Sequence, residues 1–353
     1  MSTSTSLRVR EHELLSAARG GDENAFGRLV ERYRGELHAH CYRMLGSVHD
    51  AEDALQDALL RAWRALPRFE GRSSLRSWLY RIATNTCLDL VSRRPKRVVP
   101  IDYGPPADAR LGPGEPLLES VWIEPYPDEA VGLTDGFAAP AARYEQREGV
   151  ELAFVAALQH LPARQRAVLI LREVLGFSAA EVATAIDTSV PAVNSALQRA
   201  RKTIDDHLPQ RSQQATLRSL GDEQLRALVE GYVEAWERGD VEAVVAMLTA
   251  DATLTMPPMP TWYRGEGVRT FLEEWAFNGR AYDAVGRRRV RVLSTRANGQ
   301  PAFATYSWHP QRGAHLPTVL QVLTLRDGRI EEICGFVTPA VFARFGLPAE
   351  LPA

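Results

Sequence analysis

The chain has 353 residues, of which 45% are hydrophobic and 24% charged, and its formal net charge is −2. These values suit a protein with two or three globular domains. The net charge is uninformative by itself because it averages over segments of opposite sign, which have to be read separately.

Three cysteines and the absence of long apolar runs bear on the compartment. Cys41, Cys87 and Cys334 have neither CxxC nor Cys/His ligand spacing, so we expect free buried thiols, no metal site and no cofactor. No stretch approaches the roughly 20 apolar residues of a membrane span, and the N-terminus lacks the apolar core of a signal peptide. We therefore expect a cytoplasmic protein without a membrane partner.

Residues 11–97 are expected to be helical, because apolar residues recur at helical spacing on both sides of a break at Gly20–Asp22. The part from Asp50 to Arg97 carries two charged surfaces. An acidic cluster comes first, and ten basic residues follow against only two acidic ones. Arginines that track phosphates, interleaved with aromatic rings that stack on bases, suit single-stranded nucleic acid. The alternative to nucleic-acid binding is that the charged residues are solvated helix faces and that the aromatic rings belong to the core.

Residues 98–142 differ in composition from the segments on either side. They contain eight prolines, five glycines and eight acidic residues, and Arg110 is their single basic residue. This composition predicts an extended linker, mobile when free.

Helical periodicity returns over residues 143–209. There, Ser178 and Glu181 form a capping box at the start of a short helix, and a turn at Asp187–Thr188 leads to a second helix near Ser189. The second helix has an apolar face and a polar, basic face, which is typical of a helix-turn-helix that reads the major groove.

The last segment, residues 219–346, starts with two amphipathic helices and continues with alternating strand-like runs, with Asp327–Gly328 as a hairpin signal. Helices followed by a curved antiparallel sheet predict an α+β domain. The fold class is therefore multidomain, with two all-α parts and one α+β part.

The Asp50–Arg97 stretch resembles the σ2 domain of bacterial group 4 (extracytoplasmic-function) sigma factors, on the run DAEDALQDALLRAWRALPRFEGRSSLRSWLYRIATN. The helix-turn-helix is similar to the σ4 domain of the same family and follows in the expected order. The resemblance implies that the partners are the β′ and β subunits of core RNA polymerase and promoter DNA. The linker then threads the channel through which RNA leaves.

The resemblance also assigns residues to three surfaces. The polymerase-binding surface comprises Asp50, Glu52, Asp53, Gln56 and Asp57. The surface for the −10 promoter element, with a loop at Phe69–Ser74 that pockets a flipped base, comprises Phe69, Arg72, Ser73, Trp78, Arg81, Asn85, Arg93 and Arg94. The surface for the −35 element comprises Ser189, Pro191, Asn194, Ser195, Gln198, Arg199, Arg201 and Lys202.

The C-terminal domain resembles SnoaL-like domains, which share the cone-shaped fold of ketosteroid isomerase, on the run YVEAWERGDVEAVVAMLTADATLTMPPMPTWYRG. Where that isomerase has its catalytic aspartate, this chain has Met256, and a thioether cannot take a proton. We therefore expect no catalytic residues and no enzyme. The candidate pocket residues, which are equally consistent with an ordinary core, are Tyr232, Trp236, Met256, Trp262, Tyr263 and Trp308.

These expectations combine into one function. The chain is identified as a sigma factor that directs promoter recognition, melting and transcription initiation. Its SnoaL-like domain, as in the SigG-like and SigJ-like groups, modulates that activity in cis. The alternative is a helix-turn-helix DNA-binding regulator with a SnoaL-like domain that senses or turns over a small molecule, and a ligand of this kind stays open.

Overall fold

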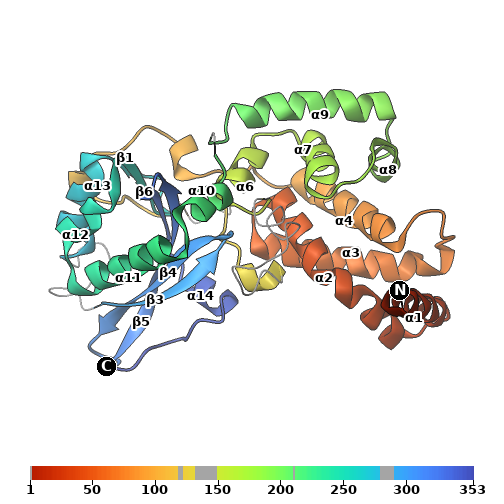
Figure 1. Cartoon of the computed structure of the whole chain (residues 1–353), viewed down its shortest axis with the longest axis horizontal. Coiled ribbons are helices and arrows are strands. Elements are labelled where there is room, and N and C mark those ends of the chain that lie inside the picture. Colours follow the sequence, from red (N-terminus) through yellow and green to blue (C-terminus); the bar gives the residue numbers. More distant parts are fainter. Residues whose placement is uncertain (1, 118–121, 132–148, 210, 279–289) are drawn as a thin grey trace. The chain divides into compact units, whose positions relative to one another are not determined.

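The computed structural model describes residues 2–117, 122–131, 149–209, 211–278 and 290–353, which form two compact units (Figure 1). The first, here the helical unit, contains residues 2–96, 130–131 and 157–207. The second, here the sheet unit, contains the remaining described residues. The boundary expected between linker and helix-turn-helix segment, at residues 142 and 143, lies outside the described residues.

The helical unit contains the helices α1 (Ser2–Arg19), α2 (Glu23–Leu45), α3 (Val48–Ala65), η1 (Leu66–Arg68), α4 (Leu75–Val91), α7 (Ala163–Leu169), η5 (Ile170–Val174), α8 (Ala179–Ala185) and α9 (Val190–Asp205). The chain passes between the units within α6 (Leu152–Gln159). The break expected at Gly20–Asp22 falls between α1 and α2, where the Asp22 side chain accepts a hydrogen bond from the Ala25 amide. Gly46, in the left-handed region with φ 69°, ends α2.

The core of the first four helices contains two adjacent thiols. Cys41 on α2 and Cys87 on α4 are both fully buried, and both are free. Contact with Cys41, together with burial, raises the pKa of the Cys87 thiol well above its ordinary value. The two buried side chains act as small apolar groups in a packed interior.

The helix-turn-helix forms as the sequence predicted. Both hydrogen bonds of the Ser178–Glu181 capping box are present at the start of α8. Asp187 takes a positive φ of 51° in the turn, and the Ser189 hydroxyl caps α9 by accepting from the Ala192 amide. The buried face of α9 consists of Val193, Leu197, Ala200 and Ile204.

The sheet unit has one six-stranded sheet in the order β2-β1-β6-β5-β4-β3. Its strands are β1 (Leu248–Thr255), β2 (Trp262–Arg264), β3 (Val290–Ala297), β4 (Gln300–His309), β5 (Ala314–Arg326) and β6 (Arg329–Phe336). Its helices are α10 (Gln213–Leu220), α11 (Asp222–Arg238), α12 (Val241–Ala246), α13 (Glu266–Phe271), η6 (Leu272–Ala276) and α14 (Ala340–Arg344). The short 3-10 turns η2 (Pro100–Asp102), η3 (Ala109–Leu111) and η4 (Asp128–Val131) precede them.

The sheet differs in two respects from the curved antiparallel sheet that the sequence predicted. It is mixed, because β1 pairs in parallel with β6 while every other pair is antiparallel, and it is open, with β2 and β3 at its edges. The meander β3–β6 starts at one edge of the sheet, so its last strand arrives beside β1 and runs in the same direction. The predicted hairpin at Asp327–Gly328 joins β5 to β6, with positive φ at both residues.

Helices α11, α12 and α13 cover one face of the sheet and enclose its apolar core (Figure 1). Tyr232 of α11 packs there against Trp236 on the same helix and against Phe303 of β4. Ala109, from the segment expected to be a free linker, belongs to the same core. Described residues 97–117 and 122–129 are part of the sheet unit, so this stretch is folded onto the domain that follows it much later in the chain. Among the described residues, no helix is long and apolar enough to cross a membrane.

Candidate polymerase and promoter interfaces

The exposed side of α3 is acidic. Glu52, Asp53, Gln56 and Asp57 are exposed, and the opposite side buries Ala51, Ala54, Leu55, Ala58 and Ala62. The spacing of three and four residues places the four polar side chains on one face. This arrangement presents several carboxylates to a partner on a rigid helix.

Asp50 does not belong to that exposed face, contrary to the sequence prediction. Its residue is 3% exposed, and its carboxylate forms an ion pair with Arg94. A carboxylate in the first turn is also favoured by the positive end of the helix dipole. Arg94 lies 44 positions further along the chain, so local sequence patterns gave no sign of this pair.

The predicted −10 residues divide into exposed and packed groups. Arg72, Ser73, Arg81, Arg93 and Arg94 are exposed. Phe69, by contrast, is 6% exposed, and its ring lies 4.9 Å from that of Trp78. Phe69 is therefore already packed against Trp78, and the exposed arginines form the accessible basic surface.

Asn85 is engaged within the helical unit. Its side-chain amide donates to the Ala185 carbonyl at 3.2 Å, and Ser77, on the same helix α4, donates to Glu181 at 3.1 Å. Both acceptors belong to α8, the first helix of the helix-turn-helix. The face of α4 that carries Asn85 is thus covered by α8 in this structure.

Aromatic contacts and a buried arginine add to this packing. The rings of Tyr80 and Phe177 meet edge to face at 5.3 Å, and the Arg76 guanidinium lies over both rings. Arg166 of α7 is 4% exposed and donates to the Met44 carbonyl near the end of α2.

Arg166 contributes to the packing of α7 on α2, and the sequence analysis did not predict this role. Its other hydrogen bonds go to the side chain and carbonyl of Gln159 and to the Leu161 carbonyl. Burial lowers the pKa of Arg166 to about 10. The negative end of the α2 dipole favours a cation at this point. In the sequence, Arg166 follows Arg164 and Gln165, and such a polar stretch is typical of a solvent-exposed helix face.

The predicted −35 face on α9 is exposed as expected, at Pro191, Asn194, Ser195, Gln198, Arg199, Arg201 and Lys202. Arg201 is paired with Glu173 of η5. Ser189 uses its hydroxyl to cap the helix, so its contribution here is structural. The face presents amides, hydroxyls and cations on one helix, which are groups that hydrogen-bond to base edges and phosphates.

The candidate pocket residues of the sheet unit fall into three places. Tyr232, Trp236, Met256 and Tyr263 belong to the helix-covered core. The Tyr232 hydroxyl donates to the Gln321 side chain at 3.1 Å. Trp262 donates its indole N–H to the Gly104 carbonyl at 2.7 Å. Trp308 pairs instead with His315 across β4 and β5. The six residues therefore do not line one site.

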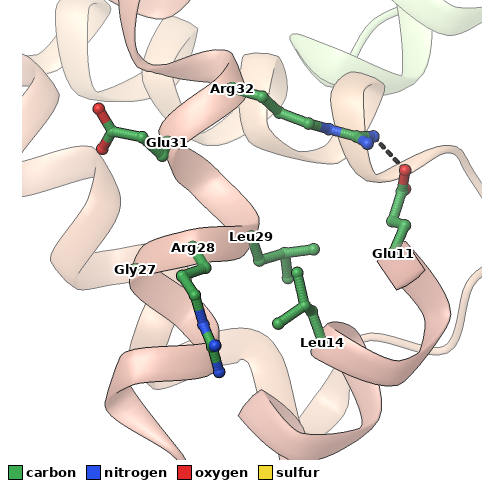
Figure 2. A pocket seen from close by; sticks show the side chains of 7 residues that line it. All are labelled: Glu11, Leu14, Gly27, Arg28, Leu29, Glu31 and Arg32. Carbon is green, nitrogen blue, oxygen red and sulfur yellow. Dashed lines mark hydrogen bonds and ion pairs between the residues drawn. The ribbon is translucent and has the colours of Figure 1, made fainter. Parts of the chain in front are cut away.

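A groove of about 450 Å³ lies between α1 and α2 (Figure 2). Leu14 and Leu29 line its floor, and Glu11 reaches across to an ion pair with Arg32. None of the predicted site residues lines this groove.

Comparison with protein families places these surfaces in known regions. Residues 29–97 match Sigma-70 region 2, residues 151–204 match Sigma-70, region 4, and residues 229–333 match the SnoaL-like domain. A chain with region 2 followed by a helix-turn-helix region 4 is an RNA polymerase sigma factor.

Relatives refine that class. The chain is 43% identical over 334 residues to the ECF RNA polymerase sigma factor SigG of Mycobacterium tuberculosis, which covers 94% of this chain and 86% of SigG. It is 29% identical over 201 residues to the ECF RNA polymerase sigma-E factor of Escherichia coli, covering 57% of this chain and 95% of that factor. The chain therefore belongs to the ECF sigma factors.

A solved structure shares the organisation of the fold. The M. tuberculosis extracytoplasmic function sigma factor SigJ matches with a TM-score of 0.53 at 23% identity, covering 90% of this chain and 97% of SigJ.

Proposed function

We propose that this sigma factor binds core RNA polymerase through the exposed acidic face of α3, formed by Glu52, Asp53, Gln56 and Asp57. The face is rigid, because it lies on an 18-residue helix that is capped at Ser47 and packed along its opposite side. Side chains held on a rigid element lose little freedom on binding. Complementary charge also steers the encounter with a basic partner.

The basic side chains of α4 and its flanking loop contact the −10 element, and the polar face of α9 contacts the −35 element. Arg81 and Arg93 are exposed and would meet phosphates, and Arg94 is exposed as well but also pairs with the buried Asp50. Asn85 meets a base edge only after α8 has moved away, because its amide is otherwise bonded to the Ala185 carbonyl. The closed arrangement of α4 and α8 therefore requires an opening step before the −10 element is bound.

The SnoaL-like domain modulates the sigma factor in cis and does not act as an enzyme. The position that carries the aspartate base in related isomerases is the buried Met256, and the Tyr232 hydroxyl is satisfied by Gln321. Because Met256 cannot take a proton, isomerase chemistry of that kind lacks its base at that position. Because its target is RNA polymerase, the protein acts in the cytoplasm.

Charge reversal on α3 tests the central assignment. Asp53→Lys with Asp57→Lys should lower the affinity for core polymerase about tenfold or more and abolish transcription from promoters with paired −35 and −10 elements. Glu230→Lys with Glu234→Lys makes the same charge change at the same spacing on exposed residues of α11 and serves as the control. Equal polymerase binding by both variants would favour a DNA-binding regulator that does not engage polymerase.

A further inference from the structure

The linker segment, residues 104–117, is held on the sheet unit by a ladder of hydrogen bonds. The Ala107 amide donates to the Trp262 carbonyl at 2.8 Å, and the Leu117 amide donates to the Pro258 carbonyl at 3.0 Å. The Trp262 indole donates to the Gly104 carbonyl at 2.7 Å, and the Thr261 hydroxyl donates to the Pro113 carbonyl. Residues 258–262 thus recognise the backbone of a proline-rich segment, much as a strand edge recognises a peptide.

Small side chains fit the segment to this surface. Ala109 is 3% exposed and belongs to the apolar core, and Gly112 lies against the Trp275 ring. A Cβ atom at Gly112 would come within 2.6 Å of that ring. Arg110 and Leu111 point outward, and Leu111 is 80% exposed. The buried side of the segment therefore accepts only small residues, as a specific binding site would.

The docked linker also closes on itself. Val98 and Trp122 form a bridge, the Ile123 amide donates to the Val98 carbonyl at 3.2 Å, and Arg97 donates to the Trp122 carbonyl at 2.6 Å. The 24 residues that follow Val98 up to Trp122 would span up to about 80 Å when extended and roughly 25–30 Å as a flexible chain. When docked, they add almost no reach to the tether between regions 2 and 4.

We propose that the binding partner of this surface on the SnoaL-like domain is the chain's own linker. While the linker is docked on this domain, it adds little to the length of the tether between region 2 and region 4. The docked linker thereby restrains the separation of the two regions. Release of the linker lengthens the tether and permits the α4 and α8 faces to part. The inference rests on the proposed sigma function, whereas the docking itself is measurable without it.

Two glycines provide a matched pair of full-length variants. Gly112 and Gly114 both have positive φ, 80° and 71°, so replacement by alanine strains the backbone at both positions. Only Gly112→Ala also drives a Cβ atom into Trp275, because at Gly114 the nearest atom, in Thr261, is 3.4 Å away. Gly114→Ala therefore controls for a positive-φ glycine replaced within the same docked segment, and Gly112→Ala adds the collision with Trp275.

Release is read out by trypsin and by hydrogen exchange on the full chain. Arg110 is the single basic residue of 98–142, so cleavage after it reports on the docked segment. We expect cleavage about tenfold or more faster in Gly112→Ala than in Gly114→Ala, with faster exchange of the Ala107 and Leu117 amides. Equal cleavage and exchange in the two variants would overturn the docking surface.

Transcription by core polymerase then tests the restraint. Higher transcript yield from Gly112→Ala than from Gly114→Ala and the parent supports the docked linker as a restraint. If the linker is released in Gly112→Ala but the transcript yield does not rise, the proposed restraint is wrong, while the sigma function is unaffected. Absence of transcription and of polymerase binding in all three proteins would instead refute the proposed function, and cleavage and exchange would still decide the docking.

Discussion

Replacing Arg166 with methionine tests whether a buried cation holds region 4 against region 2. Four acceptors lose their donor in Arg166→Met, namely the carbonyls of Met44, Gln159 and Leu161 and the Gln159 side chain. A buried acceptor without a partner costs about 1–3 kcal/mol. Carbonyl oxygens tolerate this better than charged groups do, so the low end applies and the sum is about 4 kcal/mol.

Part of that loss is offset, because methionine fills the volume without burying a charge. The desolvation that lowers the pKa of Arg166 to about 10 disappears with the guanidinium. We therefore expect Arg166→Met to lower the free energy of unfolding of the helical unit by about 2–4 kcal/mol. The Met44 contact joins α7 to α2, so protection of the α4–α8 contact should fall as well.

Hydrogen exchange across α4 and α8, together with urea unfolding, measures both effects in the full chain. Arg164→Met, on the same helix but exposed, is the matched control and should change the stability by less than about 0.5 kcal/mol. A change below about 1 kcal/mol in Arg166→Met, with α8 exchange equal to that of the parent, would refute the reasoning.

Three further predictions concern DNA binding and pH. Arg199→Ala should weaken binding to a −35 duplex by about 1–3 kcal/mol in a footprinting titration, and an unchanged footprint would contradict a base contact. Burial raises the pKa of Glu332 to about 7, so the unfolded chain loses its proton first and stability falls between pH 4.5 and 7. Glu332→Gln should remove this fall and stabilise the sheet unit by about 1–3 kcal/mol at pH 8, measured by urea unfolding against the parent at both pH values. Burial lowers the pKa of His40 to about 3, so the unfolded chain takes up the proton and stability is lost as pH falls below 6.5. His40→Gln should flatten that acid loss, which is about 1.4 kcal/mol per pH unit, and a parallel pH profile for parent and variant would exclude this origin.

Local patterns in the sequence were enough for several elements of both units. The Ser178–Glu181 capping box, the apolar face of α9 and the Asp327–Gly328 hairpin depend on interactions within a few residues, which a linear pattern records. The acidic face of α3 follows from the same helical spacing, except at Asp50.

Only the tertiary structure decided how distant segments meet. The Asp50–Arg94 ion pair, the Arg166 contacts near the end of α2 and the bond from Asn85 to Ala185 join residues 44 to 122 positions apart. The composition of the linker predicted an extended tether, because it contains too few large apolar residues to form its own core. The structure instead packs Ala109 into the core of the SnoaL-like domain and Gly112 against Trp275 beside it, so the domain supplies the apolar surface that the linker lacks.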